Sequence, residues 1–222
     1  MTTAADLGYT LEAMESDRLP ARRLLLRAAL FALPGVALAA GGLSHPHTLT
    51  GETAAYWWRL HVALIPVFPL LGLALAALVG RRRDVLAWAV RVLAYVYALG
   101  YTALDMLSGV ATGYTVDPAV TVGDGPAPLA LKRLYGIGND LGTIGAQAFL
   151  IASVLVAIDA VRRIGVRAAP PGLVLVVASV SFLDSHIYPW RGVVTVLAIG
   201  LATGWLCWLR APAERPQEAL SS

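Results

Sequence analysis

Apolar residues follow one another in six long runs that are separated by short polar segments. A helix of about 20 apolar residues rises far enough, at about 1.5 Å per residue, to cross a hydrocarbon core about 30 Å thick. The pattern therefore predicts an all-α, polytopic membrane protein, a bundle of six transmembrane helices in contact with the lipid bilayer. The predicted spans are Leu24–Leu43, Leu60–Gly80, Val85–Gly109 (or from Val92), Leu141–Val161, Gly172–Trp190 and Gly192–Leu209.

Composition agrees with this class. The 222 residues are 58% hydrophobic and only 14% charged, whereas a soluble domain carries about 25% charged residues. The formal charge of +3 does not indicate a nucleic-acid partner, because the basic residues lie mostly between the apolar runs, where they act as topology signals.

The distribution of the basic residues predicts the orientation. With the N-terminus inside, the inner segments hold Arg18, Arg22, Arg23, Arg81, Arg82, Arg83, Arg162, Arg163, Arg167, Arg210 and Arg215. The outer segments hold Arg59, Lys132, Arg133 and Arg191. Positive charge favours the cytoplasmic side, so both termini are expected in the cytoplasm (N-in/C-in). Sixteen arginines accompany a single lysine, a bias typical of GC-rich bacteria, and we expect a multi-pass protein of the bacterial cytoplasmic (inner) membrane.

The chain divides into three regions. Residues 1–19 form a polar cytoplasmic tail, 20–210 the six-helix transmembrane domain, and 211–222 a disordered cytoplasmic tail. An alternative is that the first span is a signal peptide cleaved near Ala37–Ala39, which the acidic residues before it disfavour. The outer segment 111–128, rich in Gly, Pro and Asp, is expected to be an extended cap.

Three local patterns predict how the spans pack. Pro66 and Pro69 in the second span each remove a backbone hydrogen bond, which predicts a kink. The pairs Gly138/Gly142 and Gly200/Gly204 have the four-residue spacing that lets helices approach closely, within the chain or, alternatively, in an oligomer. The short link "PWRG" predicts a tight hairpin between the last two spans.

Histidines and carboxylates gather at the outer ends of the predicted spans. His45 and His47 follow the first span, His61 opens the second and His186 ends the fifth. Asp105 lies within the third span, and an aspartate in the membrane is costly without a partner. We predict an outer-face site that binds a transition metal or a metal-containing cofactor, or another ion or small molecule, formed by His45, His47, His61, His186, Asp105 and Asp184. Surrounding residues expected to orient these ligands are Tyr101, Asp140, Glu52 and Arg59.

Four functions remain open for this cluster. Imidazoles and carboxylates together suit a transition metal such as Zn, Cu, Fe or Ni. A haem held by His61 and His186 is a second possibility, and a proton relay in a small proton-coupled transporter or permease is a third. The fourth is a structural or accessory membrane subunit, in which the histidines only cap helices.

Several catalytic classes are excluded by missing motifs. The single cysteine, Cys207, rules out a CxxC site and an intramolecular disulfide. The chain contains no GxSxG elbow, P-loop or dinucleotide-binding glycine pattern. The triplet "DSH" at 184–186 cannot form a nucleophilic triad by itself, because neighbours on a helix point about 100° apart.

Overall fold

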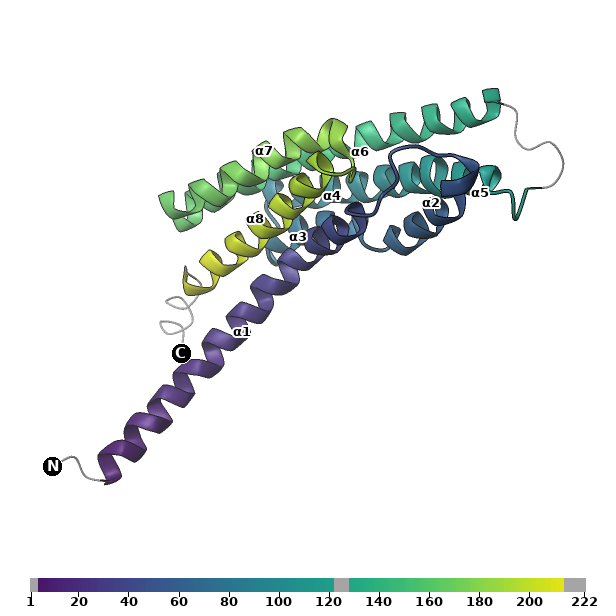
Figure 1. Cartoon of the computed structure of the whole chain (residues 1–222). Coiled ribbons are helices and arrows are strands. Elements are labelled where there is room, and N and C mark those ends of the chain that lie inside the picture. The colour runs from purple at the N-terminus through teal and green to yellow at the C-terminus, as the bar shows by residue number, and fades with distance from the viewer. Residues whose placement is uncertain (1–3, 122–127, 214–222) are drawn as a thin grey trace.

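The computed structural model describes the backbone of residues 4–121 and 128–213 and the side chains of 21–121 and 128–210. Every regular element in this part of the chain is helical (Figure 1). The elements are α1 (Ala4–Gly42), α2 (Gly51–Leu64), α3 (Phe68–Leu78), α4 (Val85–Leu104), the π-helix η1 (Asp105–Ala111), α5 (Thr112–Val116), α6 (Pro128–Ile164), the 3₁₀-helix η2 (Val166–Ala168), α7 (Ala169–Ser185) and α8 (Arg191–Ala213).

Six of the described segments are long and apolar enough to cross a membrane, as the sequence predicts. They are Ala21–Gly42, Gly51–Leu78, Val85–Val116, Pro128–Ile164, Val166–Ser185 and Arg191–Arg210. The protein is therefore a multi-pass helical bundle. Residues 214–222 of the predicted C-terminal tail lie outside the described residues.

The second span is interrupted at its prolines. α2 ends at Leu64 and α3 begins at Phe68. Pro66 and Pro69 have no N–H to donate to the carbonyls four residues earlier, so the chain makes a turn in which the Val67 N–H donates to the Leu64 carbonyl at 2.8 Å. The predicted kink is confirmed as a break between two helices.

The third span is longer than predicted, and the expectation of an extended segment over 111–128 was wrong for 111–116, while 122–127 lie outside the described residues. The helix continues past Gly109 as η1 and α5 and ends at Val116. Threonine hydroxyls bond back to earlier carbonyls here, Thr112 to Ser108 at 2.5 Å and Thr115 to Ala111 at 2.9 Å. The fourth span also begins early, at Pro128, because proline is well suited to the first turn of a helix.

Small residues bring two pairs of helices into close contact. A Cβ on Gly200 would lie 2.6 Å from the Ala32 carbonyl of α1, and one on Gly204 would lie 2.8 Å from that of Ala28. Gly138 and Gly142 of α6 face Ser108 and Leu104 in the same way. Both glycine pairs are thus buried in contacts within the chain.

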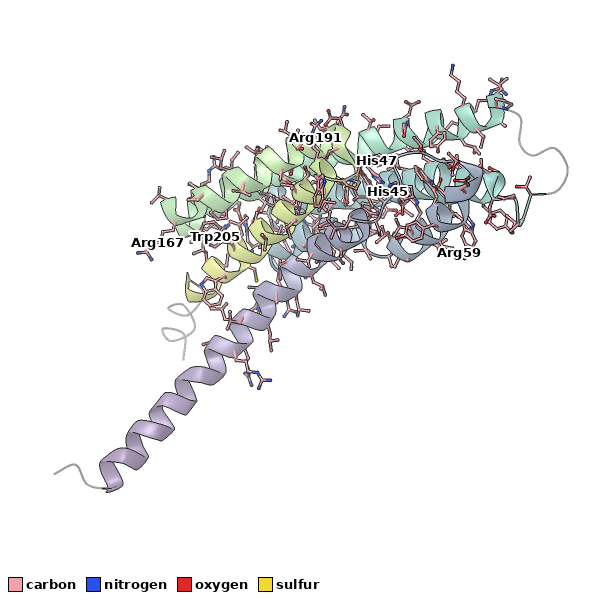
Figure 2. All side chains as sticks on the ribbon, in the orientation of Figure 1. His45, His47, Arg59, Arg167, Arg191 and Trp205 are labelled. Atoms are coloured by element: carbon pink, nitrogen blue, oxygen red, sulfur yellow. The ribbon has the colours of Figure 1, made fainter. Side chains whose placement is uncertain are left out.

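The bundle has two chemically different ends. We call the end that carries His45, His61 and His186 the histidine end, and the end that carries Arg82 and Arg167 the arginine end. The spans containing α2, α4 and α6 comprise 28, 32 and 37 residues, against 20 to 22 for the other three. At the histidine end α2, α5 and the start of α6 therefore extend beyond the ends of α7 and α8 (Figure 1). Arg167 and Trp205 lie at the opposite end from Arg59, with His45 between them (Figure 2).

Candidate metal centre

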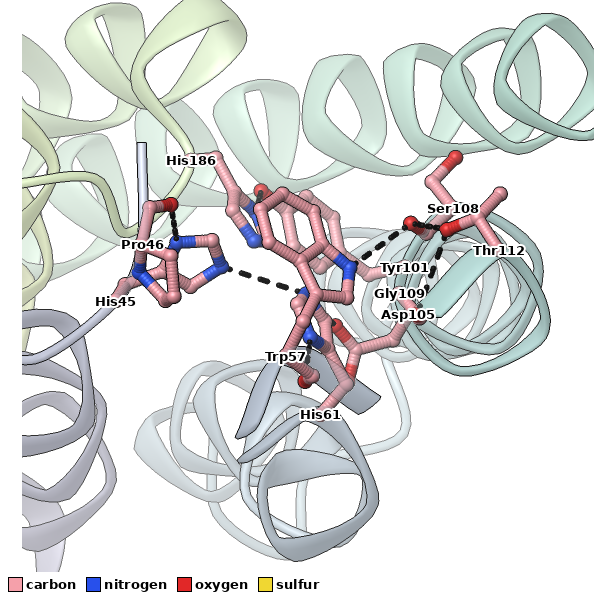
Figure 3. A network of polar contacts seen from close by, with 10 residues as sticks. All are labelled: His45, Pro46, Trp57, His61, Tyr101, Asp105, Ser108, Gly109, Thr112 and His186. Carbon is pink, nitrogen blue, oxygen red and sulfur yellow. Dashed lines mark hydrogen bonds and ion pairs between the residues drawn. The ribbon is translucent and has the colours of Figure 1, made fainter. Parts of the chain in front are cut away.

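Three histidines from separate parts of the chain meet where the shorter helices end. His45 lies in the loop after α1, His61 in α2, and His186 directly after α7. One ring nitrogen from each lies within 4.8 Å of the other two. His45 and His61 are each only 3% exposed. Figure 3 shows the three rings pointing toward one another.

Backbone carbonyls orient two of the rings. The Nδ1 of His45 is 2.7 Å from the Pro46 carbonyl, and the Nδ1 of His61 is 2.7 Å from the Trp57 carbonyl. A carbonyl only accepts hydrogen bonds, so we assign the proton of each neutral ring to Nδ1. The remaining Nε2 atoms then present lone pairs, and they face each other across 3.5 Å.

Two facing lone pairs repel unless a cation or a proton lies between them. Burial, followed by the neighbouring His61, lowers the pKa of His45 from 6.5 to about 4. His45 is therefore neutral near pH 7 and does not supply that proton. Neutral imidazoles with an outward Nε2 and a hydrogen-bonded Nδ1 are the form in which histidine ligates metals.

His186 completes the group from the end of α7. Its Nδ1 is 3.1 Å from the Tyr101 hydroxyl, which fixes the ring from behind. Burial, together with the neighbouring His45 and His61, lowers its pKa well below 6.5. Its backbone has φ 42° and ψ −139°, a conformation that non-glycine residues rarely adopt and that costs about 1–3 kcal/mol. This backbone turns the side chain away from the direction of α7 and toward the other two histidines.

A buried aspartate lies next to the three rings. Asp105 is 1% exposed, and one of its oxygens is 3.9 Å from Nε2 of His61. Both of its oxygens lack a hydrogen-bond partner in the described structure. Buried polar atoms are nearly always paired, so this carboxylate marks a place where a cation or a bound water fits. It does not belong to the group whose ligand atoms all lie within 4.8 Å.

His47 and Asp184 lie outside the group of three histidines. Both were predicted members of the site, but the loop after α1 turns here and leaves His47 exposed against Tyr188. Asp184 is exposed and forms an ion pair with Arg191 at 2.6 Å.

Of the four residues expected to orient the ligands, one lies against the histidine cluster and three lie on the surface. Only Tyr101 contacts a clustered histidine. Asp140 and Glu52 are exposed on α6 and α2. Arg59 is also exposed, and its guanidinium lies 5.2 Å from the centre of the Trp58 ring.

Trp57 has a role that the sequence pattern did not reveal. It is only 3% exposed. Its ring stacks on His61 at 5.3 Å, and its indole N–H donates to the Ser108 carbonyl at 3.4 Å. The signal was available, because Trp57 and His61 are four residues apart and share a helix face.

A partly open cavity of about 370 Å³ adjoins the histidines. His61, His186 and Asp105 form part of its wall, and the rest comes from α2, α4, η1, α6, the end of α7 with Asp184, and Tyr188 in the loop after α7. The site therefore combines potential ligands with space for another molecule. Comparison with protein-family profiles, curated proteins and solved structures gave no significant match.

Proposed function

We propose that the protein binds one divalent transition-metal ion through Nε2 of His45, His61 and His186. The facing Nε2 atoms of His45 and His61, 3.5 Å apart with both Nδ1 atoms bonded to carbonyls, carry this proposal. A metal ion at the centre would replace the lone-pair repulsion with two coordinate bonds. It would also give the unpaired carboxylate of Asp105 an opposite charge nearby.

Zinc fits this set of ligands best. Zn–N bonds are about 2.0–2.1 Å, so nitrogens around a tetrahedral zinc are about 3.3 Å apart. The His45–His61 pair is close to that separation at 3.5 Å, and the group as a whole spans up to 4.8 Å. Zinc binding would therefore draw the most distant pair of ligand nitrogens together by up to about 1.5 Å. Three protein ligands leave a fourth position open, the pattern of catalytic rather than structural zinc.

The ring packing disfavours haem. The ring of His45 contacts those of His61 and His186 edge-on, with centroids 5.1 and 5.7 Å apart. The His61 and His186 rings are nearly parallel at 6.1 Å, and Phe68 and Tyr101 pack on His186 from 5.6 and 5.8 Å. A flat macrocycle between two axial histidines would have to displace these rings.

The interior of the bundle disfavours a proton-coupled transporter. Below the site its centre is filled by fully buried Leu75, Phe149 and Phe182. At the arginine end Asp159 is held in ion pairs by Arg82 at 2.6 Å and Arg163 at 2.9 Å. A relay would need to pass both the apolar side chains and this network.

We also assign the histidine end to the outer face of a bacterial cytoplasmic membrane. The arginine-rich segments support this assignment, because positive charge stays on the cytoplasmic side. The metal would then be acquired from the periplasm.

The test is metal binding by the purified protein in detergent. After chelator treatment and addition of Zn²⁺ or Co²⁺, elemental analysis is expected to find one ion per chain, and Co²⁺ to give the visible absorption of a tetrahedral site. His61→Ala and His186→Ala are expected to lose the ion. His47→Ala is the matched control, because His47 is exposed two residues from His45, and it should bind as the wild type does. A Soret band would favour haem, and absence of both metal and haem would overturn the proposal.

A further inference from the structure

The cavity beside the histidines opens sideways between two helices. Its buried walls include Asp105 and Ser108 of η1, whereas its exposed lining residues are Asn139 and Thr143 of α6 and Leu183 and Asp184 of α7. α6 and α7 pack together along the bundle, but α6 starts well beyond the end of α7 at this end (Figure 1). The mouth therefore lies at the side of the bundle.

Exposed aliphatic side chains lie on α6 and α7 beside the mouth, next to the exposed ion pair between Asp184 and Arg191. Ile144 is 54% exposed, Val180 51% and Leu183 37%. In a chain with six helices that can cross a membrane, exposed aliphatic side chains on the helix sides face lipid. A molecule thus reaches the cavity most directly from the bilayer, near the level at which α7 ends.

The lining selects for an uncharged polar group. Hydroxyls and an amide are supplied by Ser108, Tyr135, Asn139 and Thr143, and the Ser108 hydroxyl is buried without a partner. The described lining includes no lysine or arginine. A phosphate would meet the carboxylates of Asp105 and Asp184, and Arg191 beside the lining is already paired with Asp184. A carbonyl group finds several hydrogen-bond donors.

The ligand cluster faces this cavity on one side. His61, His186 and Asp105 line it, and His45 closes the cluster from the other side. The open fourth position of a three-histidine metal site is therefore directed to the cavity, next to a carboxylate without a partner. Three neutral ligands, one open position and an adjacent acid–base group are what metal-assisted hydrolysis requires.

We propose that the protein hydrolyses a carboxylic ester or amide of an uncharged membrane lipid, with the carbonyl group in this cavity and the acyl chain left in the bilayer. This inference rests on the proposed metal site. The metal would lower the pKa of its bound water and polarise the carbonyl. Asp105 would accept the proton of that water, while Asn139 and Thr143 would position the carbonyl group.

The reaction needs no oxidant or reductant. The water oxygen bonds to the carbonyl carbon, and the bond from that carbon to the ester oxygen or amide nitrogen breaks. The proton held by Asp105 passes to the departing oxygen or nitrogen. The products are a fatty acid and an alcohol or amine, and one oxygen of the acid comes from water.

The experiment uses the zinc-loaded protein in detergent micelles with two probes, dioleoylglycerol as the ester and N-oleoylsphingosine as the amide. In H₂¹⁸O, release of oleate with one ¹⁸O atom is expected from at least one probe. Asp105→Asn is expected to lower the rate at least a hundredfold, and Thr143→Phe, which narrows the mouth, to abolish it. Both variants should retain zinc, and His47→Ala should retain both zinc and activity.

The outcomes separate the two proposals. Zinc bound without oleate release from either probe would overturn the hydrolase and leave the metal site standing. Zinc missing from the wild type would overturn the metal site itself. Equal cleavage of dioleoylphosphatidylcholine would contradict the preference for an uncharged lipid.

Discussion

At the residue scale, the candidate site depends on hydrogen bonds that the sequence could only partly predict. All three clustered histidines and Asp105 were predicted site residues. An ionisable side chain in or beside a membrane span raises the free energy of insertion unless it has a partner, so such residues mark candidate sites. The choice of His45 over His47 could not be predicted, because it depends on the turn of one loop. The carbonyls of Pro46 and Trp57 that orient the rings belong to the backbone. Every residue has such a carbonyl, so the sequence does not show which ones accept these hydrogen bonds.

The lowered pKa of His45 predicts a pH-dependent stability in the metal-free protein. The pKa is about 4 in the folded state and 6.5 in the reference state, so between these values the unfolded chain binds more protons. Lowering the pH through this window favours unfolding, by up to about 3 kcal/mol from this residue. Thermal unfolding in detergent should give a Tm that falls from pH 6.5 to pH 4.5.

Two variants isolate the contribution of His45 to this pH dependence. His45→Gln is expected to make the fall in Tm shallower, whereas His47→Gln should leave it as in the wild type. The same slope in both variants would contradict the buried, neutral state of His45.

At the element scale, helix lengths and helix contacts determine where the histidines meet. The six spans and the break at Pro66 follow from apolar run length and from proline chemistry. The π-helix and the continuation to Val116 were missed, because glycine and threonine in that segment also suit a loop. There the bonds of the threonine hydroxyls and the packing of η1 and α5 on α2 outweigh local propensity.

The contact between α1 and α8 should govern both stability and metal affinity. In Gly200→Leu the new side chain would meet the Ala32 backbone, since even a Cβ would lie 2.6 Å from its carbonyl oxygen. We expect a loss of about 1–3 kcal/mol in the free energy of unfolding. Because α1 leads into the loop with His45, zinc affinity should fall at least tenfold, as measured by competition with a chromophoric chelator.

Gly136→Ala provides the matched control for this contact. A Cβ at Gly136 would have no neighbour within 4 Å. This variant is therefore expected to keep the wild-type zinc affinity and to gain about 0.5–1 kcal/mol in the free energy of unfolding. Wild-type stability and affinity in Gly200→Leu would show that the close helix contact does not hold the site together.

At the scale of the whole molecule, the two ends of the bundle have separate chemistry. Arginines and their ion pairs with Asp84 and Asp159 gather at one end, and histidines with a cavity at the other. The bias in basic residues could be obtained from the sequence alone. The cavity could not, because it depends on how far α6 extends past α7.

The orientation can be tested by labelling single cysteines. In a Cys207→Ala background, Glu52→Cys places a thiol at the exposed histidine end and Val166→Cys at the exposed arginine end. In intact spheroplasts, a membrane-impermeant maleimide is expected to label only the Glu52→Cys protein. After lysis it is expected to label both variants. Labelling of Val166→Cys alone before lysis would reverse the assignment.

The central claim is that His45, His61 and His186 together hold one metal ion, and X-ray absorption spectroscopy of the zinc-loaded protein tests it most directly. The arrangement predicts three imidazole nitrogens at about 2.0–2.1 Å, with the outer-shell scattering of imidazole rings, unchanged in His47→Ala, whereas His186→Ala should no longer hold zinc. A coordination shell of oxygen atoms alone, or a His186→Ala protein that binds zinc with the same three-imidazole shell, would contradict the claim.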